Sequence, residues 1–285
     1  MALATAYRLA RRGLDRLGVR RLPGAARVDA AVRRALGGAR VQVLGHTMRV
    51  DRADSLFLLR HGVYEPTMTR LIEERVRAGD VVVDVGANIG YHTLLFARLV
   101  GPEGRVVAFE PDEENFAVLA ENVRANGYAN VELVRAAVAD RSGTVALRRS
   151  SDNSGDHRIF AADEERETVE VPCVTLDEHL GDAVRVDVVK VDVQGAEAAV
   201  LRGMRGVLAR SPVRAILTEV WPQGLAAAGD DAAAYLAELQ AAGFSFELVD
   251  EEAGRVEALE PAPLLEALAR DPYGGNVVCT ARADA

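Results

Sequence analysis

Cysteine is scarce in this chain of 285 residues, because only Cys173 and Cys279 occur. The two are far apart and form no C-x-x-C motif, so the sequence gives no indication of a zinc site or a dithiol redox centre. Both lie in apolar, strand-like stretches. We therefore expect buried and unreactive thiols.

Long apolar runs are missing as well. No stretch approaches the roughly 20 apolar residues that a transmembrane helix needs. The first eight residues, Met-Ala-Leu-Ala-Thr-Ala-Tyr-Arg, lack the uninterrupted apolar core of a secretory signal. We expect a cytoplasmic protein without stable membrane insertion.

Charge is unevenly spread along the chain, and the first 40 residues carry an excess of positive charge. Residues 1–40 hold ten arginines and two aspartates, although the whole chain has a net charge of −9, so the remainder is strongly acidic. Such a surface argues against DNA or RNA as a partner. It suits a cationic cofactor and a small neutral or cationic substrate.

Residues 1–40 are predicted to form a helical extension. Apolar residues at alternating spacings of four and three form one helical stripe, and they are Leu3, Tyr7, Ala10, Leu14 and Leu17. Pro23-Gly24 breaks this pattern, and residues 28–36 follow as a second short helix. We expect the extension to pack on the body of the protein or to build a homodimer contact. Binding to a membrane surface is the less favoured alternative.

The most informative stretch is residues 81–93, Val-Val-Val-Asp-Val-Gly-Ala-Asn-Ile-Gly-Tyr-His-Thr. An apolar strand runs into a glycine-rich turn, and an apolar helix follows. A second strand, at 105–110, ends in Glu110, twenty residues after Gly90. This layout is typical of a nucleotide-type site on a doubly wound sheet, in which the acid accepts hydrogen bonds from a ribose.

The spacing within the turn indicates which ligand is bound. A dinucleotide fingerprint reads G-x-G-x-x-G, whereas this chain has Asp84-x-Gly86-x-Asn88-x-Gly90. A carboxylate before the turn would repel a pyrophosphate, but it suits the ammonium and sulfonium groups of S-adenosylmethionine. A methyltransferase is therefore favoured over a dehydrogenase or a purely structural turn.

The order of the predicted elements indicates an α/β fold. After a hairpin and a helix at 41–80, strands at 81–85, 105–110, 131–135, 184–193 and 213–220 alternate with helices at 90–100, 112–126, 195–209 and 231–242. Strands at 244–249 and 276–281 close the sheet, and a hairpin-like insertion occupies about 143–175. Alternating strands and helices predict a doubly wound, mostly parallel, seven-stranded Rossmann-like sheet over residues 81–285.

Three sequence blocks resemble the FkbM family of S-adenosylmethionine-dependent methyltransferases, a class I methyltransferase fold. They are Asp84–Thr93, the run Ala108-Phe-Glu-Pro-Asp112 with Asn115, and Lys190-Val-Asp-Val-Gln-Gly-Ala-Glu197. The resemblance implies O-methylation of a small molecule in a natural-product, sugar or lipid pathway. One departure is Gln194, where the family has a glutamate, because an amide is neither a base nor a strong metal ligand.

The candidate cofactor residues follow from the turn and from the second strand. Asp84 is expected on the methionine side and Glu110 on the ribose. A small residue at Ala137 leaves room for the adenine ring. The remaining candidates are Gly86, Asn88, Gly90, Tyr91, Thr93, Pro111, Asp112 and Asn115, of which Thr93 and Asp112 have helix capping as an alternative role.

The candidate catalytic residues are Asp192 and Glu219, which end two central strands, and His157, which lies in a polar loop. Metal-free removal of a proton by Asp192, aided by a histidine, is favoured. The alternative is a magnesium ion held by the two carboxylates. The sequence is also compatible with N-methylation of a small molecule, and with a non-catalytic subunit that keeps the cofactor fold.

Overall fold

The computed structural model describes residues 6–7, 10, 28, 31–32, 35–150, 153–160 and 166–282. Most of the predicted stripe at 3–17 and the break at 23–24 lie outside the described residues. Within the described part, none of the helices combines the length and apolar character needed to cross a bilayer.

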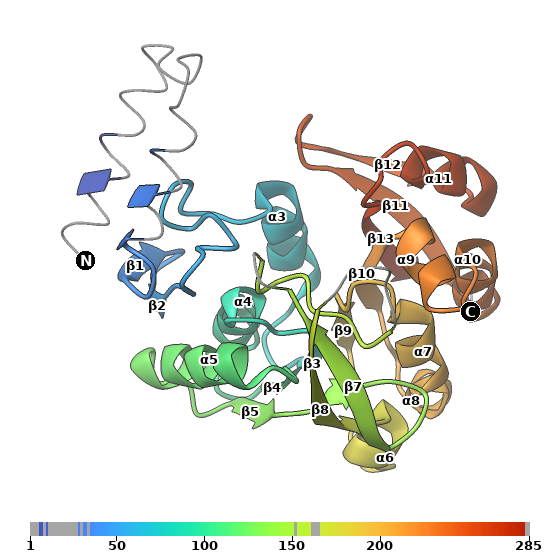
Figure 1. Cartoon of the computed structure of the whole chain (residues 1–285). Helices are drawn as coiled ribbons and strands as arrows, with labels where there is room; N and C mark the ends of the chain where they lie inside the picture. Colours follow the sequence, from blue (N-terminus) through green and yellow to red (C-terminus); the bar gives the residue numbers. More distant parts are fainter. Residues whose placement is uncertain are drawn as a thin grey trace.

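The main sheet has eight strands in the order β12-β11-β13-β10-β9-β3-β4-β5, with helices on both sides (Figure 1). The strands β5, β4, β3, β9 and β10 pair in parallel, and three antiparallel pairings complete the other edge. The bounds are β3 (Val81–Val85), β4 (Arg105–Phe109), β5 (Val131–Val134), β9 (Val188–Val191), β10 (Ala215–Val220), β11 (Phe244–Asp250), β12 (Arg255–Leu259) and β13 (Gly275–Ala281).

The predicted mostly parallel sheet is confirmed, but the predicted number of seven strands is wrong. The additional strand is β12, which pairs only with β11 at the edge of the sheet. Its sequence, Arg-Val-Glu-Ala-Leu, is short and partly charged, and its residues are exposed or half-buried. An edge strand needs no apolar face on both sides, so the hydrophobic pattern did not reveal it.

Side-chain alternation along the parallel strands determines which helices cover each face. Val82, Val106 and Val188 pack with α3 (Pro66–Arg75) and α4 (Tyr91–Val100). Val83 and Val107 belong to the opposite core, together with residues of several helices further along the chain. These are α6 (Leu176–Leu180), α7 (Glu197–Arg202), α8 (Arg205–Arg210), α9 (Pro222–Ala227), α10 (Ala232–Ala241) and α11 (Pro261–Leu268).

Two small sheets flank the main one. The first is the hairpin of β1 (Arg40–Val43) and β2 (His46–Arg49), which packs with α5 (Glu113–Ala125). The second has the order β6-β8-β7, from β6 (Ala137–Val138), β7 (Gly143–Arg149) and β8 (Glu167–Val174). The β7–β8 hairpin brings residues 153–160 to the candidate site described below.

The single helix predicted at 195–209 is two helices, α7 and α8, and the break coincides with Gly203. A Cβ atom at Gly203 would lie 2.0 Å from the carbonyl oxygen of Ala139. The Gly203 carbonyl also accepts a hydrogen bond from Asp177 N at 3.0 Å. The backbone at Gly203 therefore packs directly against the residue that follows β6, and the helix is interrupted at this contact.

Candidate active site

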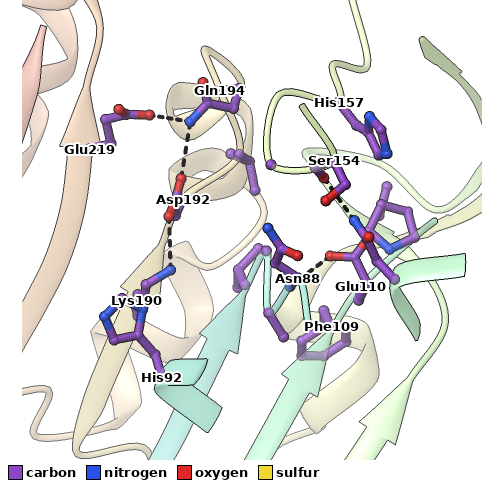
Figure 2. Close-up of a pocket in the computed structure, with 18 of the residues that line it drawn as sticks. Asn88, His92, Phe109, Glu110, Ser154, His157, Lys190, Asp192, Gln194 and Glu219 are labelled. Atoms are coloured by element: carbon purple, nitrogen blue, oxygen red, sulfur yellow. Dashed lines mark hydrogen bonds and ion pairs between the residues drawn. The ribbon is translucent and has the colours of Figure 1, made fainter. Parts of the chain in front are cut away.

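A cavity opens at the carboxyl ends of β3, β4, β9 and β10, where open α/β sheets bind their ligands. Figure 2 shows Glu110 and Asn88 on one side of it and Asp192, Gln194 and Glu219 on the other. The turns after β3 and β4, the strand β6 and the loop of the β7–β8 hairpin also contribute to the lining.

The turn after β3 depends on its glycines because other backbone segments come very close. Gly86 has a φ of 82°, and a Cβ atom there would lie 1.9 Å from the carbonyl oxygen of Asp192. Gly90 has a φ of 92°, and its Cβ would lie 2.6 Å from Leu119 Cδ1. Gly86 lines the cavity, whereas Gly90 serves the packing of α5 behind it.

Glu110 lines the cavity directly after β4 and also braces the turn. Its Oε2 accepts a hydrogen bond from Asn88 N at 2.8 Å, and its Oε1 accepts one from Asp112 N at 2.9 Å. Burial raises the pKa of Glu110 to about 8, against the effect of these hydrogen bonds. Carboxylate oxygens carry further lone pairs, so this group can also accept from ligand hydroxyls.

The three candidate cofactor residues that follow Glu110 in the sequence have two different roles. Pro111 and Asn115 line the cavity. Asp112 is a helix cap, because its Oδ1 accepts from Glu114 N and Asn115 N, each at 3.0 Å, and its Oδ2 pairs with Arg149 Nε at 2.8 Å. The capping alternative therefore describes how Asp112 is used in this structure.

Beside Glu110 the cavity is apolar. Ala136, Ala137 and other side chains form this part of the lining, and small residues there leave space for a flat ring. The others are Phe109, Val138, Leu147 and Ile159.

Asp84 and Thr93 lie behind the cavity lining and bind each other. Thr93 Oγ1 donates to Asp84 Oδ2 at 2.6 Å, and Asp84 is fully buried. Burial raises the pKa of Asp84, which the charge of Lys190 and the Thr93 hydroxyl partly offset. Lys190 Nζ is 3.8 Å from Asp84 Oδ1, since the two residues are register partners on β9 and β3.

A chain of polar side chains crosses the other end of the cavity (Figure 2). Lys190 Nζ donates to Asp192 Oδ2 at 3.1 Å. Gln194 Nε2 lies between Asp192 Oδ1, at 3.2 Å, and Glu219 Oε2, at 2.5 Å. Burial alone would lower the pKa of Lys190, but Asp192, Asp84 and Glu65 outweigh it and raise the pKa. The lysine is therefore charged and fixes the Asp192 carboxylate.

Two aromatic residues of α4 also line this region. The Tyr91 hydroxyl is 2.9 Å from Thr69 Oγ1. Burial and then the charge of Lys190 lower the pKa of His92 well below its ordinary value, so the imidazole is neutral. Among the described residues His92 Nε2 has no hydrogen-bond partner, and Glu65 Oε2 is 3.9 Å away.

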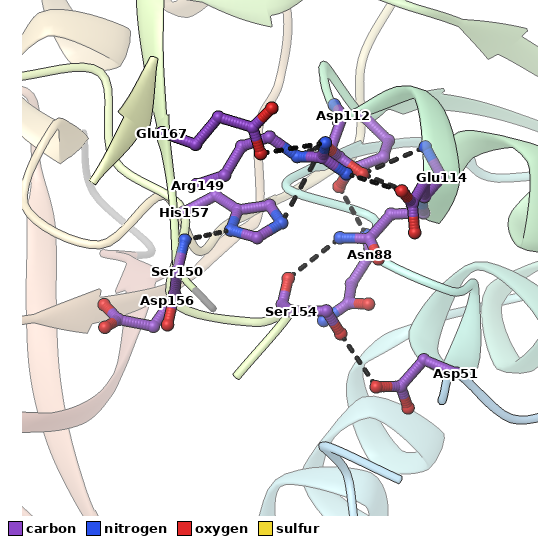
Figure 3. A network of polar contacts seen from close by, with 12 residues as sticks. Asp51, Asn88, Asp112, Glu114, Arg149, Ser150, Ser154, Asp156, His157 and Glu167 are labelled. Carbon is purple, nitrogen blue, oxygen red and sulfur yellow. Dashed lines mark hydrogen bonds and ion pairs between the residues drawn. The ribbon is translucent and has the colours of Figure 1, made fainter. Parts of the chain in front are cut away.

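His157 lies on the Glu110 side of the cavity and not with Asp192 (Figure 2). Its Nδ1 accepts a hydrogen bond from Ser150 N at 3.0 Å, and its Nε2 is 3.9 Å from Asp112 Oδ2. Figure 3 shows His157 within this network of loop contacts. Burial lowers the pKa of His157, although the charge of Asp112 opposes this effect.

The loop that carries His157 is tied to the body through Ser154. Its carbonyl accepts from Asn115 Nδ2 at 2.8 Å, and its hydroxyl donates to Asp51 Oδ2 at 3.0 Å (Figure 3). Sequence reasoning placed neither Asp51 nor His92 among the candidate site residues. The position of His92 directly after Tyr91 in the cofactor turn was the available signal, whereas nothing in the sequence marked Asp51.

Among the described residues no set of three or more His, Cys, Asp and Glu side chains is arranged to hold a metal ion. Between Asp192 and Glu219 lies the amide of Gln194.

Comparison with known proteins agrees with this geometry. The model of the FkbM methyltransferase domain matches residues 84–246. The chain is 31% identical over 173 residues to the hexuronic acid methyltransferase AglP of Haloferax volcanii. The aligned residues cover 59% of this chain and 68% of that protein. It is 42% identical over 85 residues to the 31-O-demethyl-FK506 methyltransferase FkbM of Streptomyces tacrolimicus, covering 30% of this chain and 28% of that one.

Among solved structures, an S-adenosylmethionine-dependent O-methyltransferase from Thermotoga maritima is similar with 14% identity and a TM-score of 0.43, covering 86% of this chain and 78% of that chain. The match to the methyltransferase domain, on a mostly parallel α/β sheet with its cavity at the carboxyl edge, identifies a class I S-adenosylmethionine-dependent methyltransferase. Within that class, the chain belongs to the FkbM methyltransferase family.

Proposed function

We propose that the protein methylates a hydroxyl oxygen of a small molecule, with Asp192 as the base. The observation that carries the proposal is the Asp192 carboxylate, which lines the cavity just beyond β9 and is held between Lys190 and Gln194. The printed names of two relatives, which act on a hexuronic acid and on 31-O-demethyl-FK506, support a small acceptor.

The residues present fit S-adenosylmethionine. Glu110 offers carboxylate oxygens to the ribose hydroxyls, and the apolar lining around Ala137 suits the adenine. Asn88 Oδ1, which has no partner among the residues described, lies at the turn where the methionine part would bind. We assign Asp84 and Thr93 to positioning, because they hold Lys190 and the start of α4 from behind.

When bound, S-adenosylmethionine supplies an electrophilic methyl group, and the protein contributes alignment and proton removal. Asp192 accepts the proton of the acceptor hydroxyl as the oxygen attacks. Lys190 and Gln194 keep the carboxylate aimed at the cavity. His157 holds the loop in this proposal, and His92 is the histidine beside the reacting centre.

The metal-dependent alternative is less favoured because the Gln194 amide already bridges the two carboxylates that would hold the ion. Full activity after exhaustive chelation is expected. Loss of activity that magnesium restores would establish the metal instead.

Replacement of Asp192 tests the proposal. Asp192→Asn should keep cofactor affinity, measured by calorimetry, and lose at least about a hundredfold in the rate of methyl transfer, the usual size of a general-base effect. Product analysis of the methylated atom separates O- from N-methylation. Full activity of the variant would refute the role of Asp192, and turnover of any acceptor by the wild type excludes a non-catalytic subunit.

A further inference from the structure

Glu219 is surrounded by acidic groups at the acceptor end of the cavity. It lines the cavity, and the charges of Asp192, Glu197 and Glu65 all act on it. Burial and then these charges raise the pKa of Glu219 well above its ordinary value. Any cation that enters this space therefore stabilises the ionised carboxylate.

The cation already present, Lys190, offsets only part of this rise in the pKa of Glu219. Lys190 is the only lysine of the chain, and it faces Asp192 at 3.1 Å and Asp84 at 3.8 Å. The donor that reaches Glu219 is the neutral amide of Gln194, at 2.5 Å. A neutral hydrogen bond offsets less of the cost of a buried charge than a cation does.

His92 provides a second, independent indication of a ligand. Its side chain is 6% exposed and lines the same cavity. Its Nε2 lacks a hydrogen-bond partner within the described ranges, and buried polar atoms are normally paired. A polar group of a ligand at this end of the cavity would supply the missing hydrogen-bond partner of His92 Nε2.

We propose that the acceptor carries an ammonium group beside the hydroxyl that is methylated, and that Glu219 binds this ammonium while His92 bonds a neighbouring polar group. The inference rests on the proposed function and narrows its substrate class to hydroxylated amines. A carboxylate-bearing acceptor is disfavoured, because it brings no cation to Glu219 and its negative charge would lie beside that of Asp192. An amine held as ammonium has no lone pair for attack, so methylation is directed to oxygen.

A matched series of sugars tests the proposal on the full chain saturated with S-adenosylhomocysteine. The probes are 6-amino-6-deoxyglucose, glucose and glucuronic acid, which differ only at carbon 6, and NMR titration gives their dissociation constants. The amino sugar should bind at least about tenfold more tightly than glucose, the equivalent of 1.4 kcal/mol. Glucuronic acid should bind more weakly than glucose.

Two variants give the test its control. Glu219→Gln keeps the volume and the contact with Gln194, and should reduce the preference for the amino sugar to within about twofold. Glu247→Gln removes a carboxylate that pairs with Arg75 away from the cavity, and should leave the preference intact. Equal binding of the three sugars, no binding of the amino sugar, or an unchanged preference in Glu219→Gln would overturn the inference.

Failure of this inference can be distinguished from failure of the proposed function. S-adenosylhomocysteine binding with no preference for the amine contradicts the ammonium site alone. Absence of S-adenosylhomocysteine binding contradicts the proposed function.

Discussion

Glu110 holds the cofactor turn and faces the cavity at the same time. Its two oxygens accept from Asn88 N and Asp112 N, which fixes the turn after β3 relative to β4. The same carboxyl lines the cavity. In the proposed cofactor site, one buried residue therefore couples the shape of the turn to the position of the ribose.

Glu110→Ala should weaken binding of S-adenosylmethionine by roughly 1.5–3 kcal/mol, because the hydrogen bonds of a buried carboxyl group to the ribose hydroxyls are lost. Calorimetry measures this change. Glu113→Ala, on an exposed residue of α5 outside the cavity lining, is the matched control and should bind normally. Tight NAD binding without S-adenosylmethionine binding would contradict the cofactor assignment.

At the scale of the element, the loop at 153–160 is positioned by contacts with three other parts of the chain. Ser154 reaches Asp51 before α3 and Asn115 on α5, and His157 accepts from Ser150 at the end of β7. Since the bond from Ser150 N occupies His157 Nδ1, we regard His157 as part of the loop's attachment.

His157→Ala should raise the Michaelis constant for the cofactor several-fold and leave the pH dependence of kcat unchanged, because a loop contact is lost and no proton is transferred. Steady-state kinetics over a range of pH gives both values. His61→Ala, on an exposed histidine whose ring contacts Phe57 away from the cavity, should change neither. A loss of about a hundredfold in kcat would return His157 to the role of base.

For the whole molecule, several buried carboxyl groups link stability to pH. Burial raises the pKa of Glu65 to about 7, that of Glu110 to about 8 and that of Glu197 to about 7. In each case the folded state holds a proton that the unfolded chain releases near pH 4.5. Their contribution to stability is therefore complete below that pH and is lost as the pH rises through 7 to 8.

The ligand-free protein should therefore melt at a lower temperature at pH 8.5 than at about pH 5.5, as differential scanning calorimetry can measure. Glu110→Gln should flatten part of this slope, because its amide does not ionise. A melting temperature that rises steadily across the interval would contradict the assigned direction.

The N-terminal extension is a second property of the whole molecule. Deletion of residues 1–20 should change the oligomeric mass or lower the melting temperature, because the apolar stripe is expected to cover the body or a second copy. Light scattering and calorimetry measure the two quantities. Unchanged mass and melting together with lost binding to lipid vesicles would favour the membrane alternative.

The sequence by itself determined the parallel order of the core strands and the cofactor turn. Strand and helix periodicity are local properties, and the residues from Asp84 to Gly90 carry their spacing with them. The positions of Asp192 and Glu219 at the ends of β9 and β10 also followed, because parallel strands end at one edge.

Only the tertiary structure decided which of these side chains face the cavity. Asp84 is turned to Thr93 and Lys190, and Asp112 to the start of α5, although both stand in the motif. His92 and Gln194 line one cavity because β3 and β9, about 100 residues apart in the sequence, pair side by side. Contacts of this kind depend on packing between distant segments, and neither periodicity nor motif spacing encodes them.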